Sequence, residues 1–190
     1  MNNKALDFIK KFSYTLSSNF MTLAISTLTT LIVPKLIGVE EYGLWQLFNF
    51  YLVYVGFFHL GWIDGIYLIY GGLKYEDLDK KSFFSQFISF FVFQFIIAIV
   101  VLLMTFILVE DRDRTFIFYM IALNIITVNV YYFFVYILQA TNQIVEYAVS
   151  NMMNRIIFII LIVGQLVIGY RSYELMIASD LIAKIISLVY

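Results

Sequence analysis

The chain has 190 residues, of which 63% are hydrophobic, 19% aromatic and 13% charged, and its formal net charge at pH 7 is −1. A soluble domain carries about a quarter charged residues, so this composition excludes an ordinary soluble domain and indicates a protein with several membrane spans. The near-neutral charge provides no basic surface for nucleic acid. The absence of cysteine excludes disulfides and thiol chemistry, and the single histidine excludes a metal site with several histidines.

Six stretches are apolar and long enough to be membrane helices of about 20 residues. The first is interpreted as an uncleaved span, because no small-residue cleavage site follows it, and is expected to end at Pro34. The second carries Gly61 and Gly65 and is expected to be bent or loosened there. The fold class is therefore all-α, with expected spans at roughly residues 13–34, 42–70, 83–109, 116–138, 151–168 and 173–190.

The sixth expected span contains no stop signal, since no polar, capping or turn residue follows it. We therefore expect residues 1–190 to form the N-terminal six-helix lobe of a longer protein. The alternative is a complete protein of six spans.

Basic residues near the spans predict the orientation, because they are enriched on the cytoplasmic side. An N-terminus on the cytoplasmic side leaves four basic residues outside. The cytoplasmic set has seven: Lys4, Lys10, Lys11, Lys74, Lys80, Lys81 and Arg155. We expect a cytoplasmic N-terminus.

Polar residues in the second span share one side of the predicted helix. They fall within about a quarter-turn of each other at about 100° per residue: Gln46, Asn49, Gly56, Asp64 and Tyr67. An ionisable side chain inside a membrane marks a substrate or ion path by default. His59 lies at the edge of this side. A structural role remains open for both residues: Asp64 can be a hydrogen-bonded carboxylate near the helix end, and His59 can be a histidine that packs between helices.

Other spans also have polar sides. In the first, Thr15, Asn19, Thr22, Ser26 and Thr29 form a stripe that we interpret as a helix-packing surface. In the fourth, Asn124 aligns with Thr127 and Tyr131, and in the fifth Asn151, Asn154 and Gln165 align. In the sixth, Asp180 and Lys184 are four residues apart on one helix face, which suits either a self-neutralised pair or a polar lining that attracts an anion.

Four short segments, in order between the spans, resemble a known family. Residues 36–45 (LIGVEEYGLW), 59–65 (HLGWIDG), 70–72 (YGG) and 139–142 (QATN) are similar to segments at the corresponding places in oligosaccharide and polysaccharide flippases of the MOP superfamily (Wzx-type). The resemblance covers the whole chain in helix pattern and about a third of it in motif.

The resemblance implies one lobe of a two-lobe transporter that is not an enzyme. Such a transporter moves an undecaprenyl-pyrophosphate-linked oligosaccharide across the bacterial or archaeal cytoplasmic membrane by alternating access, for surface polysaccharide (lipopolysaccharide or capsule) synthesis. No cofactor is implied beyond a coupling Na⁺ or H⁺, and the partners are membrane lipid and the polymerase and glycosyltransferases of the same pathway. Lys184 and Arg155, the latter expected at the cytoplasmic rim, are the cations available for a phosphate. The cavity-lining candidates are Gln46, Asn49, His59, Asp64, Asn124, Asp180 and Lys184.

Three other functions remain open from the sequence. A cation-coupled exporter of the MATE type would use Asp64 as its proton or sodium site. A membrane-embedded glycosyltransferase or polymerase would need acidic residues in an outer loop, where Glu110, Asp111 and Asp113 are available but the loop is short. The third is a purely structural membrane subunit. The aligned polar stripes argue against it only weakly.

Overall fold

The computed structural model describes residues 3–189, and over that range the chain forms helices and no strand, which confirms the all-α class. Two of the elements, labelled with η, are single 3₁₀ turns. The elements are α1 (Asn3–Ile37), α2 (Val39–Val55), η1 (Gly56–His59), α3 (Trp62–Tyr70), η2 (Tyr75–Asp77), α4 (Lys80–Leu108), α5 (Arg112–Ala140), α6 (Ile144–Ile168) and α7 (Tyr173–Val189).

The protein is a multi-pass membrane protein by the length and apolarity of its helices. Within the described range, α1, α4, α5 and α6 are each long and apolar enough to span a bilayer, and α2 with α3 forms a fifth span if the bent pair crosses as one. The sixth expected span corresponds to α7, whose 17 residues rise about 25 Å, less than the hydrocarbon thickness of about 30 Å. Six spans therefore stay a prediction.

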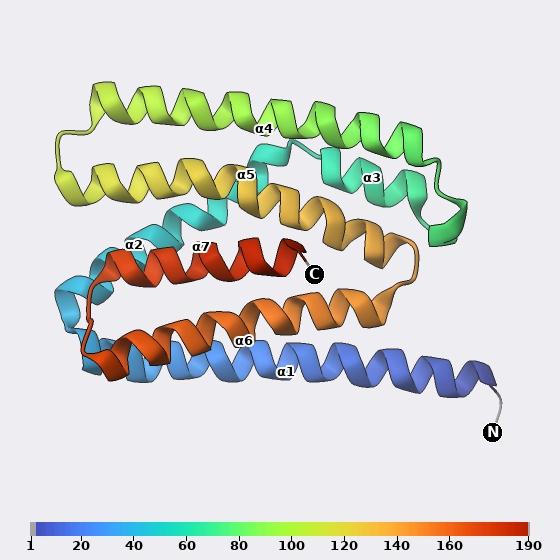
Figure 1. Cartoon of the computed structure of the whole chain (residues 1–190), viewed down its shortest axis with the longest axis horizontal. Helices are drawn as coiled ribbons and strands as arrows, with labels where there is room; N and C mark the ends of the chain where they lie inside the picture. The colour runs from blue at the N-terminus through green and yellow to red at the C-terminus, as the bar shows by residue number, and fades with distance from the viewer. Residues whose placement is uncertain (1–2, 190) are drawn as a thin grey trace.

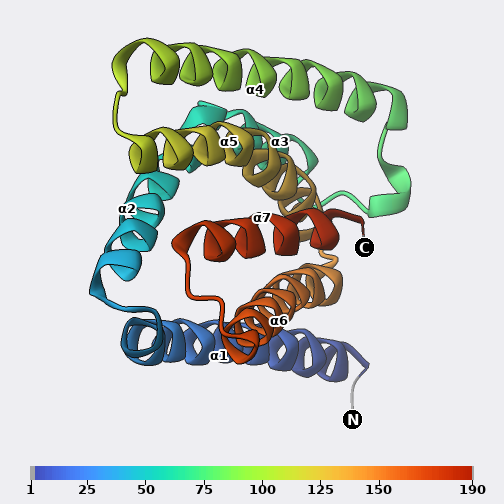
Figure 2. The same ribbon diagram turned by 60° about the vertical axis from the view of Figure 1, so that its left-hand side comes forward.

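Helix α5 is the centre of the bundle. In its most apolar stretch 61% of the residues are buried, against 17% in the corresponding stretches of α1, α4 and α6. Helix α4 packs on one side of α5, while α6 packs against both α1 and α7 (Figure 1). Turned by 60°, the bundle has α4 at one edge and α1 at the other, with α5 and α7 between them (Figure 2).

The links between helices alternate between the two ends of the bundle. The links after α1, α4 and α6 lie at one end, while the N-terminus and the links after α3 and α5 lie at the other (Figure 1). Successive helices therefore run in alternating directions through the bundle.

Three expected helix limits are wrong. Helix α1 begins at Asn3 rather than near residue 13. Helix α1 continues through Pro34 to Ile37, because the Pro34 carbonyl still accepts a hydrogen bond from Gly38 N at 3.2 Å. The helix ends where Gly38 adopts a φ of 96°, which glycine reaches at little cost. Helix α6 begins at Ile144 rather than Asn151, and this adds nearly two turns at its N-terminal end.

The second span is broken, as predicted, but the break lies at Gly56–Gly61, before the expected segment, and Gly65 lies inside the regular helix α3. After η1, Leu60 and Gly61 take left-handed conformations with φ of 48° and 79°, and the two helices on either side meet at 55°. A break inside a membrane leaves backbone carbonyls that must find other donors.

Side chains from α4 and α5 supply those donors. Gln94 Nε2 donates to the carbonyl of Phe58 at 3.2 Å, and Asn129 Nδ2 donates to the carbonyl of Val55 at 3.3 Å. Asn129 Nδ2 also donates to Gln94 Oε1 at 2.8 Å, so the two fully buried amides form one network. This network holds the bend in place.

A second set of polar contacts joins the beginnings of α2, α5 and α7. The backbone N of Tyr173, at the start of α7, donates to Glu41 Oε2 at 2.7 Å, which caps one of the free donors of that helix end. The Tyr173 hydroxyl donates to Asp113 Oδ1 at 2.8 Å. The three helices are thereby tied at the end opposite the N-terminus.

Candidate functional site

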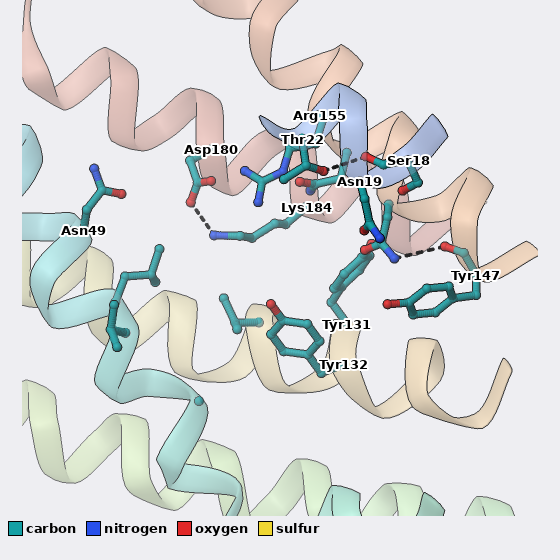
Figure 3. A pocket seen from close by; sticks show the side chains of 16 residues that line it. Ser18, Asn19, Thr22, Asn49, Tyr131, Tyr132, Tyr147, Arg155, Asp180 and Lys184 are labelled. Atoms are coloured by element: carbon teal, nitrogen blue, oxygen red, sulfur yellow. Dashed lines mark hydrogen bonds and ion pairs between the residues drawn. The ribbon is translucent and has the colours of Figure 1, made fainter. Parts of the chain in front are cut away.

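A polar cavity of about 610 Å³ lies between α1, α2, α5, α6 and α7 (Figure 3). Most of the buried side chains of the bundle are apolar and form two clusters, and this cavity lies beside the larger of them. Of its 16 lining residues, four have no polar side-chain group: Leu52, Val53, Gly56 and Val128. The other twelve are Ser18, Asn19, Thr22, Asn49, Tyr131, Tyr132, Tyr147, Asn151, Asn154, Arg155, Asp180 and Lys184.

Three charged side chains line this cavity. Asp180 and Lys184, one turn apart on α7, form an ion pair, and their side chains are only 13% and 14% exposed. Lys184 Nζ also donates to Asn124 Oδ1 of α5 at 3.3 Å. Arg155 of α6 also lines the cavity, and within residues 3–189 it has no hydrogen bond or ion pair.

The neutral polar groups are partly satisfied by one another. The Tyr131 hydroxyl donates to Asn151 Oδ1 at 3.1 Å and accepts from Ser150 Oγ at 3.4 Å. The amide of Asn154 differs, because its Nδ2 is buried and has no partner in the described part of the chain. A buried donor without an acceptor is costly, so the side of the cavity next to Arg155 offers both a cation and a free donor.

The predicted candidates separate into two groups. Asn49, Asp180 and Lys184 line the main cavity. Gln46 lines a smaller adjoining cavity of about 190 Å³, which shares Asn49, Arg155 and Asp180 with the main one. Asn124 is fully buried and reaches the site through Lys184.

His59 and Asp64 do not line either cavity. The prediction grouped Asp64 with Gln46 and Asn49 by projecting 42–70 as one straight helix. The break at Gly56–Gly61 rotates α3 out of that projection, and the Asp64 side chain is 60% exposed. Asp64 Oδ2 lies 3.7 Å from Nδ1 of His59.

Arg155 was expected at the cytoplasmic rim and instead lies near the middle of the 25-residue α6. The difference follows from the earlier start of this helix. Removing Arg155 from the cytoplasmic set leaves 7 − 1 = 6 basic residues there, against four outside, so the predicted orientation is unchanged.

The hydroxyl stripe of the first span also has a role beyond packing. Asn19 and Thr22 line the main cavity, and Ser26 and Thr29 line the adjoining one. Three tyrosines, Tyr131, Tyr132 and Tyr147, were missed as a set. Only Tyr131 had a helical-spacing signal, and in a chain with 15 tyrosines the other two had none.

Comparisons with protein-family models, with curated proteins and with solved structures found no match to this chain. Function is therefore argued from the cavity itself. Its two cations, neutral hydroxyls and amides, and aromatic rings are suited to an anionic ligand that also carries hydroxyl groups. Among residues 3–189, no cluster of three or more His, Asp and Glu side chains is arranged to hold a metal ion.

Proposed function

We propose that this chain is one lobe of a flippase that translocates an undecaprenyl-pyrophosphate-linked oligosaccharide across the cytoplasmic membrane by alternating access. The observation that carries the proposal is Arg155, a cation that has no counter-ion within residues 3–189 and lies in a polar cavity of an apolar helical bundle. An unpaired charge within a membrane is costly and is retained where an ion or substrate neutralises it.

The cavity chemistry fits a substrate with three unlike parts. Arg155 and Lys184 pair with the diphosphate, and the free Asn154 donor adds a hydrogen bond. The hydroxyls and amides of α1, α5 and α6 take the place of water around the sugars. The polyprenyl tail stays in the bilayer, where it costs nothing.

Transport requires the cavity to open to each side in turn. In transporters built from two repeats, this comes from rocking one repeat against the other about a site near the bilayer midplane. In this proposal the substrate cavity has two walls. This lobe supplies the wall that carries Arg155, from the surfaces of α1, α2, α5, α6 and α7, and a second lobe supplies the opposite wall.

The proposal is tested by replacing Arg155 with glutamine in the native cell and measuring surface polysaccharide and inner-leaflet lipid-linked oligosaccharide. We expect surface polysaccharide to fall by about tenfold or more, because a charge-assisted contact of about 1.5–3 kcal/mol is lost. The lipid-linked precursor should accumulate at the same time. The matched control is Arg171→Gln, since Arg171 is an exposed arginine in the link after α6.

Unchanged surface polysaccharide in Arg155→Gln cells, with normal amounts of the protein in the membrane, would contradict the proposal. A cation-coupled exporter, one of the other functions left open by the sequence, predicts a different pattern. There Asp64→Asn abolishes transport of a small cationic compound, and surface polysaccharide is unaffected by either variant.

A further inference from the structure

The ion pair on α7 contains the one carboxylate that lines the cavity in residues 3–189. Asp180 is paired with Lys184, and the structure gives its side chain no second hydrogen-bond donor. Both side chains are largely buried, and Figure 3 shows them pointing toward one another. The charge of Asp180 is therefore balanced by a single neighbour, which itself faces the space where a ligand would lie.

An anion in the cavity competes with Asp180 for that neighbour. Lys184 is a flexible point charge with three donors, and one of them already reaches across to Asn124 on α5. A diphosphate carries more negative charge than one carboxylate, so it attracts the ammonium more strongly. Binding of the anion at Lys184 weakens or breaks the pair with Asp180.

A buried carboxylate that loses its counter-ion must be neutralised in another way. The elements packed around α7 offer few alternatives. Helices α1 and α2 contribute no titratable side chain to the cavity, and α5 contributes two tyrosines. The titratable groups that line the cavity with Asp180 are Tyr131, Tyr132, Tyr147, Arg155 and Lys184.

Arg155 is the only other cation in that set, and the same anion occupies it. Neutral tyrosine hydroxyls can donate a hydrogen bond to a carboxylate, but they do not cancel its charge. The remaining route is a proton from water, because burial favours the neutral form of a carboxyl group.

We propose that Asp180 takes up a proton when an anion takes Lys184, so that the cavity binds one anion and one proton together. The proton passes from cavity water to a carboxylate oxygen of Asp180. It returns to water when the anion leaves and Lys184 pairs with Asp180 again. The inference rests on the proposed function, because it takes this cavity to be the place where an anion binds.

The test uses the purified protein in detergent and inorganic pyrophosphate as the probe. Calorimetric titrations at pH 7 in two buffers with different ionisation enthalpies measure how many protons are taken up per pyrophosphate bound. We expect the unmodified protein to take up about one proton more than Asp180→Asn, which keeps the side-chain size but cannot be protonated. Pyrophosphate's own protonation cancels in this difference.

Asp180→Asn is also expected to bind pyrophosphate more tightly, because an amide holds Lys184 less strongly than a carboxylate does. The matched control is Glu110→Gln, which removes an exposed carboxylate in the link between α4 and α5 and should leave both the proton count and the affinity unchanged. Equal proton counts in the unmodified protein and Asp180→Asn would overturn the inference and leave the proposed function standing. A protein that does not bind pyrophosphate at all would overturn the proposed function as well.

If Asp180→Asn does not fold, infrared difference spectroscopy on the unmodified protein gives an independent measurement. A protonated-carboxyl band should appear when pyrophosphate is added. In the double variant Lys184→Gln with Arg155→Gln, where neither cavity cation remains to balance Asp180, the same band should be present before pyrophosphate is added. An unmodified protein that binds pyrophosphate without this band would contradict the inference.

Discussion

Two acidic side chains in apolar segments each lie close to a basic side chain, and these two pairs look alike in sequence but differ in structure. His59 and Asp64 are five residues apart in the second span, and Asp180 and Lys184 are four apart in α7. The first pair is long, at 3.7 Å, and its carboxylate is 60% exposed. In the second pair both side chains are under 15% exposed, and both line the polar cavity.

The difference shows that an acidic residue in an apolar segment is not by itself a site. The break at Gly56–Gly61 directs Asp64 away from the cavity, whereas the uninterrupted helix α7 directs Asp180 and Lys184 into it together. Burial then decides how strongly each pair is coupled to folding and to a ligand.

The largest expected effect comes from breaking the buried pair on one side only. Lys184→Met leaves Asp180 buried without a counter-ion and should lower the free energy of unfolding by about 3–5 kcal/mol. Denaturant titration of the protein in detergent measures this change. The double variant Asp180→Asn with Lys184→Met removes both charges and should recover most of the loss. A single variant that costs less than about 1 kcal/mol would show that the pair is not buried in the folded protein.

A smaller effect on the free energy of unfolding is expected from disrupting the Gln94–Asn129 network, which holds the break in the second span. Gln94→Leu leaves the carbonyl of Phe58 without its side-chain donor and removes one of the two acceptors of Asn129, and should cost about 1–3 kcal/mol. The unfolding free energy measures it. Gln86→Leu is the matched control on the same helix, because it loses a single, less buried hydrogen bond to Tyr70 and should cost about 1 kcal/mol. Equal costs for the two variants would mean that the network does not hold the bend.

The smallest effect is expected at the exposed pair. Asp64→Asn should change the unfolding free energy by no more than about 1 kcal/mol, because exposed ion pairs contribute little. It should also leave pyrophosphate binding unchanged, since Asp64 lies outside the cavity. A loss as large as that of Lys184→Met would remove the distinction between the two pairs.

Much of the helical pattern was predictable from hydropathy. Helices α4, α5 and α7 begin and end within a few residues of the predicted limits, because apolar runs bounded by charged or glycine-containing links leave few other choices. The start of α6 was missed, because residues 144–150 include Glu146 and Ser150 and look less apolar than a span. That error moved Arg155 from the cavity to the rim.

The sequence by itself determined that this is an all-helical membrane protein, and that Asp180 and Lys184 share a helix face, because both properties depend on local spacing and composition. Only the tertiary structure decided which polar side chains meet. The cavity is formed by five helices from distant parts of the chain, so no single stripe could identify it. The structure also excluded Asp64 from it, because one 3₁₀ turn and two left-handed residues are enough to change the direction in which every later side chain of that span points.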